Sequence, residues 1–418
     1  MKFIHAADIH LDSPLNGLPN YEGAPLEKVR SATRDAFNNL IDLAIDESVD
    51  FVLIAGDLYD GKLEDANSGM FAFKGFARLN EAGIDVVVIR GNHDAENKVG
   101  MEVPMPPNVH ILGSKKPESV ELLEGEVVIH GQSYAKRDVT EDLASNYPAP
   151  IAGKFNIGLL HTNADGSGEH ALYAPTSVSA LQSHGYDYWA LGHIHIREVL
   201  STDPYVVYSG NIQGRHIGET GRKGATVVTV EDRTVASLEH RDLDVVRWTA
   251  IAVDVAGATS RTEALDLIQS AIDAAHSEAD GRVLAARITV TGQTAAHPSL
   301  AGDPNRLTDE ARTRAELVGP DQILIQKVKI ETTPIKNAAA ALEGDTALSE
   351  ILSQLADLDD EAVEEISKEL SPLRDKLDAE ISCELGESAI TSAEWIRQVA
   401  EGIEFEVLER IAEEVEQD

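Results

Sequence analysis

Five short apolar runs in the first half of the chain each lead into polar side chains that can bind metals. Each run is bounded by polar residues or glycine and is too short for a typical helix, which favours a buried strand. The residues that follow are Asp, Asn or His, and α/β proteins place their chemistry at such strand ends. The runs are Phe3–Ala7, Phe51–Ala55, Ile84–Ile89, Ile157–Leu160 and Tyr188–Leu191.

Helical periodicity separates the first three runs. Between Leu26 and Glu47, apolar residues such as Val29, Ala36 and Leu40 recur at the spacing of one helical face. A second helix is predicted over residues 66–82, before Gly83. Strand, helix and strand in this order predict parallel strands joined by right-handed crossovers.

Further strands are predicted after residue 108. Short segments at 109–112, 119–123 and 126–131 resemble the start of a second sheet. Antiparallel strands at 205–209, 225–230 and 235–240 are expected to close the domain. We therefore expect an α/β fold in which two sheets pack face to face, with helices outside and polar loops at the rim.

A second α/β unit is predicted from about residue 245. Its strands are expected at 248–255, 282–291 and 323–331, with helices at 261–276 and 304–317. We expect the chain to divide into a first domain of residues 1–243, a small α/β domain of residues 244–335 and a helical region of residues 336–418.

The helical region is strongly acidic. Apolar residues spaced for one helical face recur in Leu348–Leu355, Ile366–Leu377 and Trp395–Ile411. Residues 341–418 contain 24 acidic and five basic side chains. Acidic amphipathic helices favour the docking of another protein, but helices that fold back on the α/β domain would show the same periodicity.

Charge and cysteine content restrict the possible functions. The 418 residues carry a formal net charge of −37, so any contact with DNA must be local. Arg215, His216 and Arg222 are the candidates that we favour. The single cysteine, Cys383, excludes an intrachain disulfide, and no leader or apolar run of about 20 residues is evident, so we expect a cytoplasmic protein.

The strand-end side chains have the chemistry of ligands for hard or borderline divalent ions. Structural zinc usually requires several cysteines, which this chain lacks. Seven nitrogen and oxygen ligands suit two ions about 3.5–4 Å apart that share a carboxylate. The candidates are Asp8, His10, Asp57, Asn92, His161, His193 and His195.

The positions of four histidines bear on this interpretation. His193 and His195 can reach one site together only from an irregular loop, because their spacing does not suit a helix. His5 lies within the first strand and His130 at the end of another, and we expect both to be packed groups without a metal role.

These motifs, in this order, resemble the calcineurin-like metallophosphoesterases. The longer tracts around them resemble the DNA-repair branch of that family, the SbcD or meiotic-recombination-eleven nucleases, and within it the YhaO-type bacterial subgroup. The resemblance covers about residues 1–240. It is carried by Ile4–Pro14, Gly56–Asp60, Gly91–Asp94, His161–Asn163, Tyr173–Pro175, Gly192–His195 and Tyr208–Arg215.

The resemblance implies a role for each candidate. Asp8, His10, Asp57 and His195 would hold one manganese ion, and Asp57, Asn92, His161 and His193 a second. His93 would contact the phosphate and assist the leaving oxygen, with Asp94 orienting it. A hydroxide held by the metals would be the nucleophile.

The resemblance also implies a DNA exo/endonuclease that acts in repair with an SMC-like ATPase of the SbcC type. Residues 244–335 would be its capping domain, the C-terminal helices would bind the ATPase, and Leu26–Glu47 could form a homodimer contact. One alternative is a phosphodiesterase or phosphatase for small phosphoesters or phosphoproteins, because the metal core is shared across the superfamily. A non-catalytic scaffold is another alternative, although the complete ligand set argues against it.

Overall fold

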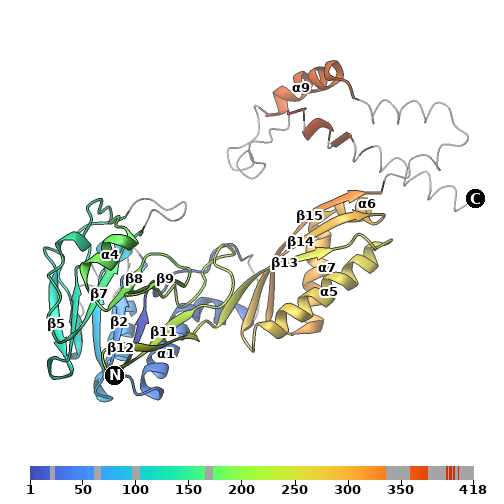
Figure 1. Cartoon of the computed structure of the whole chain (residues 1–418). Helices are drawn as coiled ribbons and strands as arrows, with labels where there is room; N and C mark the ends of the chain where they lie inside the picture. Colours follow the sequence, from blue (N-terminus) through green and yellow to red (C-terminus); the bar gives the residue numbers. More distant parts are fainter. Residues whose placement is uncertain are drawn as a thin grey trace, which may run out of the picture. The chain divides into compact units, whose positions relative to one another are not determined.

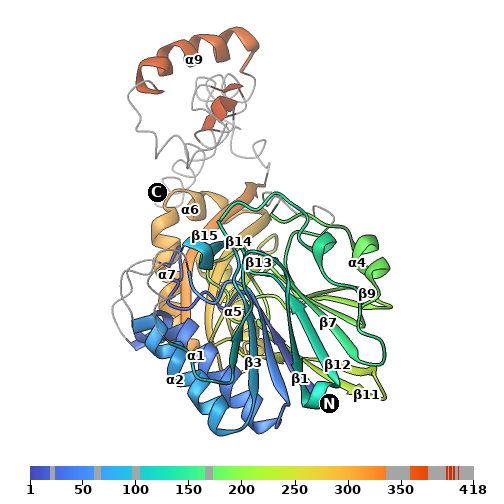
Figure 2. The ribbon, with the colours of Figure 1, turned by 90° about the vertical axis from the view of Figure 1, so that its left-hand side faces the viewer.

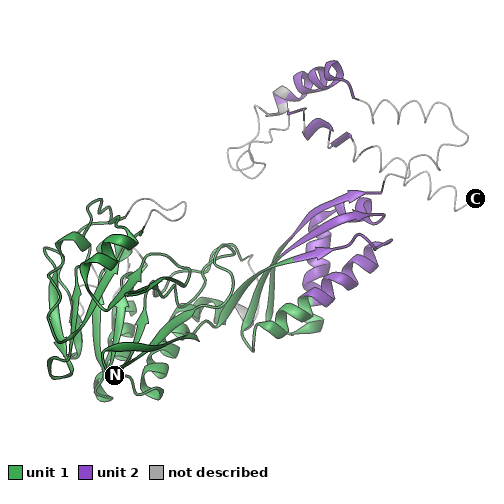
Figure 3. Ribbon diagram, viewed as in Figure 1, with its two compact units in different colours: residues 1–251, 272–287, 315–327 green, residues 252–271, 288–314, 328–418 purple. Residues whose placement is uncertain are grey.

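The computed structural model describes most of the chain, and its described residues form two compact units (Figure 3). Unit 1 comprises residues 1–251, 272–287 and 315–327, and unit 2 comprises residues 252–271, 288–314 and 328–418. The described residues are 1–18, 24–60, 67–96, 104–164, 173–335, 358–374, 392–393, 395–397, 399–400 and 403.

The first sheet of unit 1 is parallel at its centre because helices connect its strands. Helix α1 (Ala24–Asp46) joins β1 (Lys2–Ala6) to β2 (Phe51–Ala55), and α2 (Asn67–Glu81) joins β2 to β3 (Asp85–Ile89). The hairpin β11 (Gly224–Glu231) and β12 (Thr234–Asp242) adds to β1 in the antiparallel direction. The described strands of this sheet have the order β12-β11-β1-β2-β3-β4, where β4 is Val109–Ile111.

The second sheet also contains parallel neighbours at its centre. In this sheet β6 (Val127–Gly131), β7 (Phe155–His161) and β8 (Tyr188–Gly192) run parallel to one another. Helix α4 (Val178–His184) connects β7 to β8. The described strands of this sheet have the order β5-β6-β7-β8-β10-β9, where β5 is Glu118–Leu122, β9 is Glu198–Thr202 and β10 is Tyr205–Tyr208.

An apolar layer joins the two sheets, which lie side by side in Figure 2. Phe3 of β1 stacks on Phe51 of β2 at a centroid distance of 5.0 Å and meets the edge of Tyr188 of β8 at 5.4 Å. Alternate residues of the same strands, such as Ile4 and Val52, face the other way and pack against α1 and α2. The predicted arrangement of two sheets with helices outside is therefore confirmed.

Two strands lie in a different place from that predicted. Residues 109–111 form β4 of the first sheet, parallel to β3, and do not begin the second sheet. Strand β10 lies in the second sheet, parallel to β8 and antiparallel to β9, and does not pair with the β11–β12 hairpin. Local periodicity predicts a strand, but partners distant in sequence decide which sheet it joins.

The second α/β part contains the predicted elements. Strands β13 (Val246–Asp254), β14 (Val283–Thr294) and β15 (Ile323–Pro334) form a sheet in that order and contribute residues to both units. Helices α5 (Arg261–Glu278) and α7 (Pro304–Val318) connect them, and a short helix α6 (His297–Ala301), which was not predicted, precedes α7 (Figure 1).

Little of the acidic C-terminal region can be compared with its prediction. Helix α9 (Asp360–Arg374) contains the predicted apolar residues Ile366 and Leu370. The helix predicted at Leu348–Leu355 lies outside the described residues, as does most of that predicted at Trp395–Ile411. No helix among the described residues combines the length and the apolar character needed to cross a membrane.

Gly158 of β7 is required by the packing of the second sheet. A Cβ atom at this position would lie 2.2 Å from the ring of Trp189, so Gly158→Ala must displace a buried indole. Overpacking of this kind costs about 1–3 kcal/mol. We expect a lower midpoint of guanidinium unfolding, followed by circular dichroism. Gly257→Ala is the matched control, because nothing lies within 4 Å of its Cβ; equal midpoints for the two variants would contradict this packing.

Candidate metal centre

The polar side chains after five strands meet at one edge of unit 1. Asp8 and His10 follow β1, Asp57 follows β2, and Asn92 and His93 begin the short helix α3 (Asn92–Glu96) after β3. His161 ends β7 in the facing sheet, and His193 and His195 follow β8. Because parallel strands end at the same edge and the two sheets pack face to face, these eight residues from both sheets lie close together.

The loops that carry the ligands have unusual backbone conformations. Asp8, His10 and Asp57 have φ angles of 50°, 45° and 50°, in the left-handed region that non-glycine residues seldom adopt. The amide of Asp8 donates to the carbonyl of Gly56 at 3.1 Å, and the amide of His10 to that of Asp57 at 3.0 Å. These bonds hold the two loops together at the end of the sheet.

His193 lies outside the regular strand, as its spacing from His195 predicts. Strand β8 ends at Gly192, and the φ angle of His193 is 96°. The amide of His193 donates to the Asp8 carboxylate at 3.0 Å. The irregular loop therefore brings the end of the second sheet to a candidate ligand of the first.

Two glycines allow this close approach. A Cβ atom on Gly91 would lie 2.3 Å from Oδ1 of Asp57. A Cβ atom on Gly192 would lie 1.9 Å from the carbonyl oxygen of Ala55. The glycines of the Gly-Asn-His-Asp and Gly-His-x-His motifs are thus required for the contact between the strand ends.

The ligand atoms lie at distances that suit a shared metal site. Asp8, His10 and His195 each offer an atom within 4.8 Å of the others, and so do Asp8, Asp57 and His161. Oδ2 of Asp57 lies 3.5 Å from Nε2 of His161 and 3.8 Å from Nε2 of His10. Asp57 therefore lies between the two groups, where a bridging carboxylate would be needed.

Two contacts in this cluster join atoms that are both acceptors. Nδ1 of His161 lies 2.9 Å from the carbonyl of Ala55, which can only accept, so Nε2 is left with a lone pair. That lone pair lies 2.9 Å from Oδ1 of Asn92, another acceptor. Nδ1 of His195 lies 2.7 Å from the carboxylate of Glu219, and Nδ1 of His10 lies 3.3 Å from that of Asp60. The Nε2 atoms of these two rings, which are 3.3 Å apart, therefore both carry lone pairs. A cation bound between such atoms would make each pair favourable.

The electrostatics of the buried carboxylates also fit a divalent cation. Burial raises the pKa of Asp8 well above its usual value, and the charge of Asp57 raises it further. Burial likewise raises the pKa of Asp57. Burial lowers the pKa of His10 and lowers that of His161 to about 3, which keeps both imidazoles in the neutral form that binds metals. Carboxylate, amide and neutral imidazole together are a donor set for divalent ions.

His93 lies at the accessible side of the cluster. Its amide donates to Oδ1 of Asp57 at 2.9 Å, and its ring lies 4.8 Å from the ring of His10. Nδ1 of His93 is 3.0 Å from Oδ1 of Asp60, and its side chain is 33% exposed. The hydrogen bond with Asp60 raises the pKa of His93, against the opposing effect of burial. The sequence analysis did not identify Asp60, although it ends the motif that contains Asp57.

Asp60 contacts the ring of His93 in this structure, and the orienting role expected of Asp94 stays a prediction. The buried Asp94 carboxylate accepts from the amides of Leu58, Tyr59 and Gly91 at 3.1, 2.8 and 3.1 Å. It therefore joins the loop after β2 to the start of α3. Asp94 thus stabilises the backbone of the two segments that carry the candidate ligands Asp57 and Asn92.

The predicted DNA contacts have carboxylate partners. Arg215 is 15% exposed and lies 3.4 Å from Glu219 and 3.6 Å from Asp60. Nε2 of the half-exposed His216 lies 3.4 Å from Glu219. Arg222 is 68% exposed and pairs with Asp242, outside the ligand cluster. The structure thus brings Arg215 and His216 to the candidate centre, and contact with DNA stays a prediction for all three residues.

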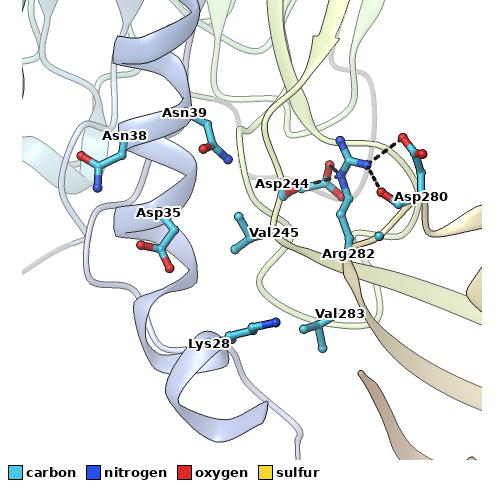
Figure 4. Close-up of a pocket in the computed structure, with 10 residues that line it drawn as sticks. Lys28, Asp35, Asn38, Asn39, Asp244, Val245, Asp280, Arg282 and Val283 are labelled. Carbon is cyan, nitrogen blue, oxygen red and sulfur yellow. Dashed lines mark hydrogen bonds and ion pairs between the residues drawn. The ribbon is translucent and has the colours of Figure 1, made fainter. Parts of the chain in front are cut away.

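The non-ligand histidines and a cavity beside α1 lie outside the cluster. The ring nitrogens of His5 lie within hydrogen-bond distance of Tyr188 Oη and the Leu191 carbonyl, and those of His130 within reach of Ser119 and Asn156, as expected of packed groups. A cavity of about 620 Å³ lies between α1 and the turn before β14, where Arg282 binds Asp244 and Asp280 (Figure 4). No predicted site residue lines it.

Family models match two segments of the chain. A model of calcineurin-like phosphoesterases matches residues 1–197, which include all seven candidate ligands. A model described as the middle domain of the metallophosphoesterase YhaO matches residues 248–333.

Three curated proteins show the range of similarity. The uncharacterized metallophosphoesterase YhaO of Bacillus subtilis is 40% identical over 273 residues, which are 64% of this chain and 67% of that protein. The DNA double-strand break repair protein Mre11 of Saccharolobus solfataricus is 28% identical over 214 residues, and that of Sulfurisphaera tokodaii 30% over 244 residues. These alignments cover 49% and 54% of this chain, and 51% and 59% of the two archaeal proteins.

Metal binding should stabilise the folded protein. A ligand present at 100 times its dissociation constant adds about 2.7 kcal/mol to stability, so removal of metal by a chelator should lower the melting temperature and Mn²⁺ should restore it. Asp57→Asn should lose most of the rise in melting temperature that Mn²⁺ produces. In the absence of metal, the variant should be no less stable than the wild type, because the substitution removes a buried charge beside Asp8. Differential scanning fluorimetry measures both effects. A wild-type melting temperature that no divalent ion changes would contradict the metal site.

Asp94→Ala should destabilise the fold. It leaves three backbone amides without their acceptor, and each buried unsatisfied donor costs about 1–3 kcal/mol. We expect a fall of several kcal/mol in the free energy of unfolding, measured by guanidinium titration. Asp85→Ala, at a partly exposed position of β3, is the control. If both variants unfold at the wild-type midpoint, Asp94 does not join these loops.

Proposed function

Because this chain belongs to the calcineurin-like metallophosphoesterase family, whose members are phosphoester hydrolases, we propose that it is a two-metal, manganese-dependent DNA exo/endonuclease that hydrolyses phosphodiester bonds in repair. Asp8, His10, Asp57 and His195 would hold one ion. Asp57, Asn92, His161 and His193 would hold the other. The ions would stabilise charge on the phosphoryl group and activate a water molecule.

The position of His93 is the observation that carries this proposal. The candidate ligands Asp8, His10, Asp57, Asn92 and His161 are buried, whereas the His93 ring beside them is one-third exposed. A phosphoester that approaches the ligands from solvent would meet this ring. His93 can then donate a proton from its ring to the leaving oxygen, while Asp60 holds the other ring nitrogen.

The proposal of DNA as substrate is supported by the similarity to the two archaeal proteins described as DNA double-strand break repair proteins. Arg215, His216 and Arg222 are the proposed contacts with the DNA backbone. We further propose that residues 1–243 form the nuclease domain and residues 244–335 a capping domain. The acidic residues 336–418 would dock an SMC-like ATPase of the SbcC type in the cytoplasm. A homodimer is part of the same proposal.

A second candidate is hydrolysis of small phosphoesters or phosphoproteins by the same metal centre. The ion pairs of Arg215 with Glu219 and Asp60, and of Arg222 with Asp242, favour it, because they reduce the positive charge available to a DNA backbone. The net charge of −37 also disfavours binding to a DNA backbone. A small diester would need no extended basic surface.

His93→Ala separates the two candidates and tests the role of His93. We expect wild-type protein with Mn²⁺ to degrade end-labelled double-stranded DNA, and the variant to be slower by a factor of about 100 or more. The loss should be smaller for bis-p-nitrophenyl phosphate, because p-nitrophenolate leaves without protonation. His110→Ala, a partly exposed histidine of β4 paired with Asp85, should behave as wild type.

Other outcomes would contradict the nuclease proposal or the role of His93. Cleavage of the small diester while DNA stays intact, even with the ATPase added, would favour the second candidate. An equal loss on both substrates would contradict proton donation by His93. Metal content must be measured for each variant, so that loss of a bound ion is not mistaken for loss of the acid.

A further inference from the structure

A buried carboxylate that the sequence analysis did not identify contacts His195. Nδ1 of His195 lies 2.7 Å from Oε1 of Glu219, whose side chain is 8% exposed. A carboxylate can only accept, so the proton of the neutral imidazole must be on Nδ1. Nε2 then carries a lone pair, and it points toward Nε2 of His10 at 3.3 Å and Oδ1 of Asp8 at 3.8 Å.

Glu219 is itself held on its other oxygen. Oε2 accepts from the backbone amide of Arg215 at 2.8 Å and from the side-chain amide of Asn211 at 2.9 Å. The loop that contains these residues is anchored to the start of β13, because the Trp248 indole donates to the carbonyl of Gly214 at 3.0 Å. Neutral donors outside the metal site thus fix the position of Oε2.

The Arg215 side chain extends this arrangement to His93. Its guanidinium lies 3.4 Å from Oε1 of Glu219 and 3.6 Å from Oδ1 of Asp60. The same Asp60 oxygen lies 3.0 Å from Nδ1 of His93 and 3.3 Å from Nδ1 of His10. The Arg215 guanidinium therefore connects the carboxylate beside His195 with the carboxylate beside His93.

We propose that Glu219 is a positioning residue for the metal centre, which fixes the tautomer and ring direction of His195 so that Nε2 faces the metal. Arg215 keeps Glu219 and Asp60 in place together, so this arginine acts from within the site in addition to any contact with DNA. The inference rests on the proposed function, in which His195 is a metal ligand. Carboxylates in this position typically contribute a factor of 10–100 to metal affinity.

Glu219→Gln in the full chain tests this role, because it keeps the volume and removes the acceptor pair. Its amide group must turn an N–H either toward His195 or toward the donors of Arg215 and Asn211. We expect one of two Mn²⁺ sites, measured by isothermal titration calorimetry, to weaken 10- to 100-fold while the other is unchanged. Glu239→Gln, at an exposed position of β12, should leave both affinities unchanged.

A spectroscopic measurement separates positioning from a general loss of stability. With Co²⁺ at saturation, the visible absorption bands of Glu219→Gln should shift, because the direction of the His195 ring changes the ligand field. Glu219→Asp keeps the charge with a shorter reach and should recover part of the affinity. It also serves as the test if Glu219→Gln does not fold.

The outcomes separate this inference from the proposed function. Wild-type affinity at both sites and an unchanged Co²⁺ spectrum in Glu219→Gln would overturn the positioning role. His195→Ala should bind one ion where wild type binds two. If it still binds two, the assignment of His195 as a ligand fails and the positioning role of Glu219 fails with it, whereas wild-type protein that binds no Mn²⁺ would contradict the proposed function itself.

Discussion

The proximity of two buried carboxylates, Asp8 and Asp57, is the constraint on which the rest of the site depends. Two like charges out of water are unfavourable unless a cation or protons compensate them. Burial raises the pKa of both carboxyl groups, and the charge of Asp57 raises that of Asp8 further. Three features hold this arrangement in place. The loops adopt left-handed φ angles, Gly91 and Gly192 have no Cβ atom, and the Asp94 carboxylate accepts hydrogen bonds from backbone amides. The surrounding sheets supply the rigidity that lets the chain maintain it.

The sequence predicted well the features that depend on local pattern. Buried strands such as Phe51–Ala55 and their polar termini could be recognised because the strand and its ligand are adjacent in the chain. The face-to-face packing of the sheets then brought the candidate ligands together. The sheet membership of β4 and β10 was not predictable in the same way, because it is decided by pairing with β3 and β8, far along the chain.

The groups around the ligands were harder to predict. Asp94 is adjacent to His93 in sequence, yet its carboxylate turns toward the loop after β2, and Asp60 from that loop reaches His93 instead. Glu219 lies 24 positions from His195 and carries no motif of its own. Contacts of this kind depend on the tertiary direction of each side chain, which neither spacing nor residue type determines.

The anchoring of the Gly214 loop by Trp248 has a consequence for recombination between relatives. Gln213 also accepts from the amides of Val245 and Val246, so Val245 and the first residues of β13 hold a loop that precedes them by about 30 positions. A chimera joined near residue 243 would take these anchors from one parent and the loop with Glu219 from another. A segment that can be exchanged between relatives therefore does not end at the border near residue 243 that the strand pattern suggests. A junction beyond Trp248 would keep the loop and the residues that hold it from the same ancestor.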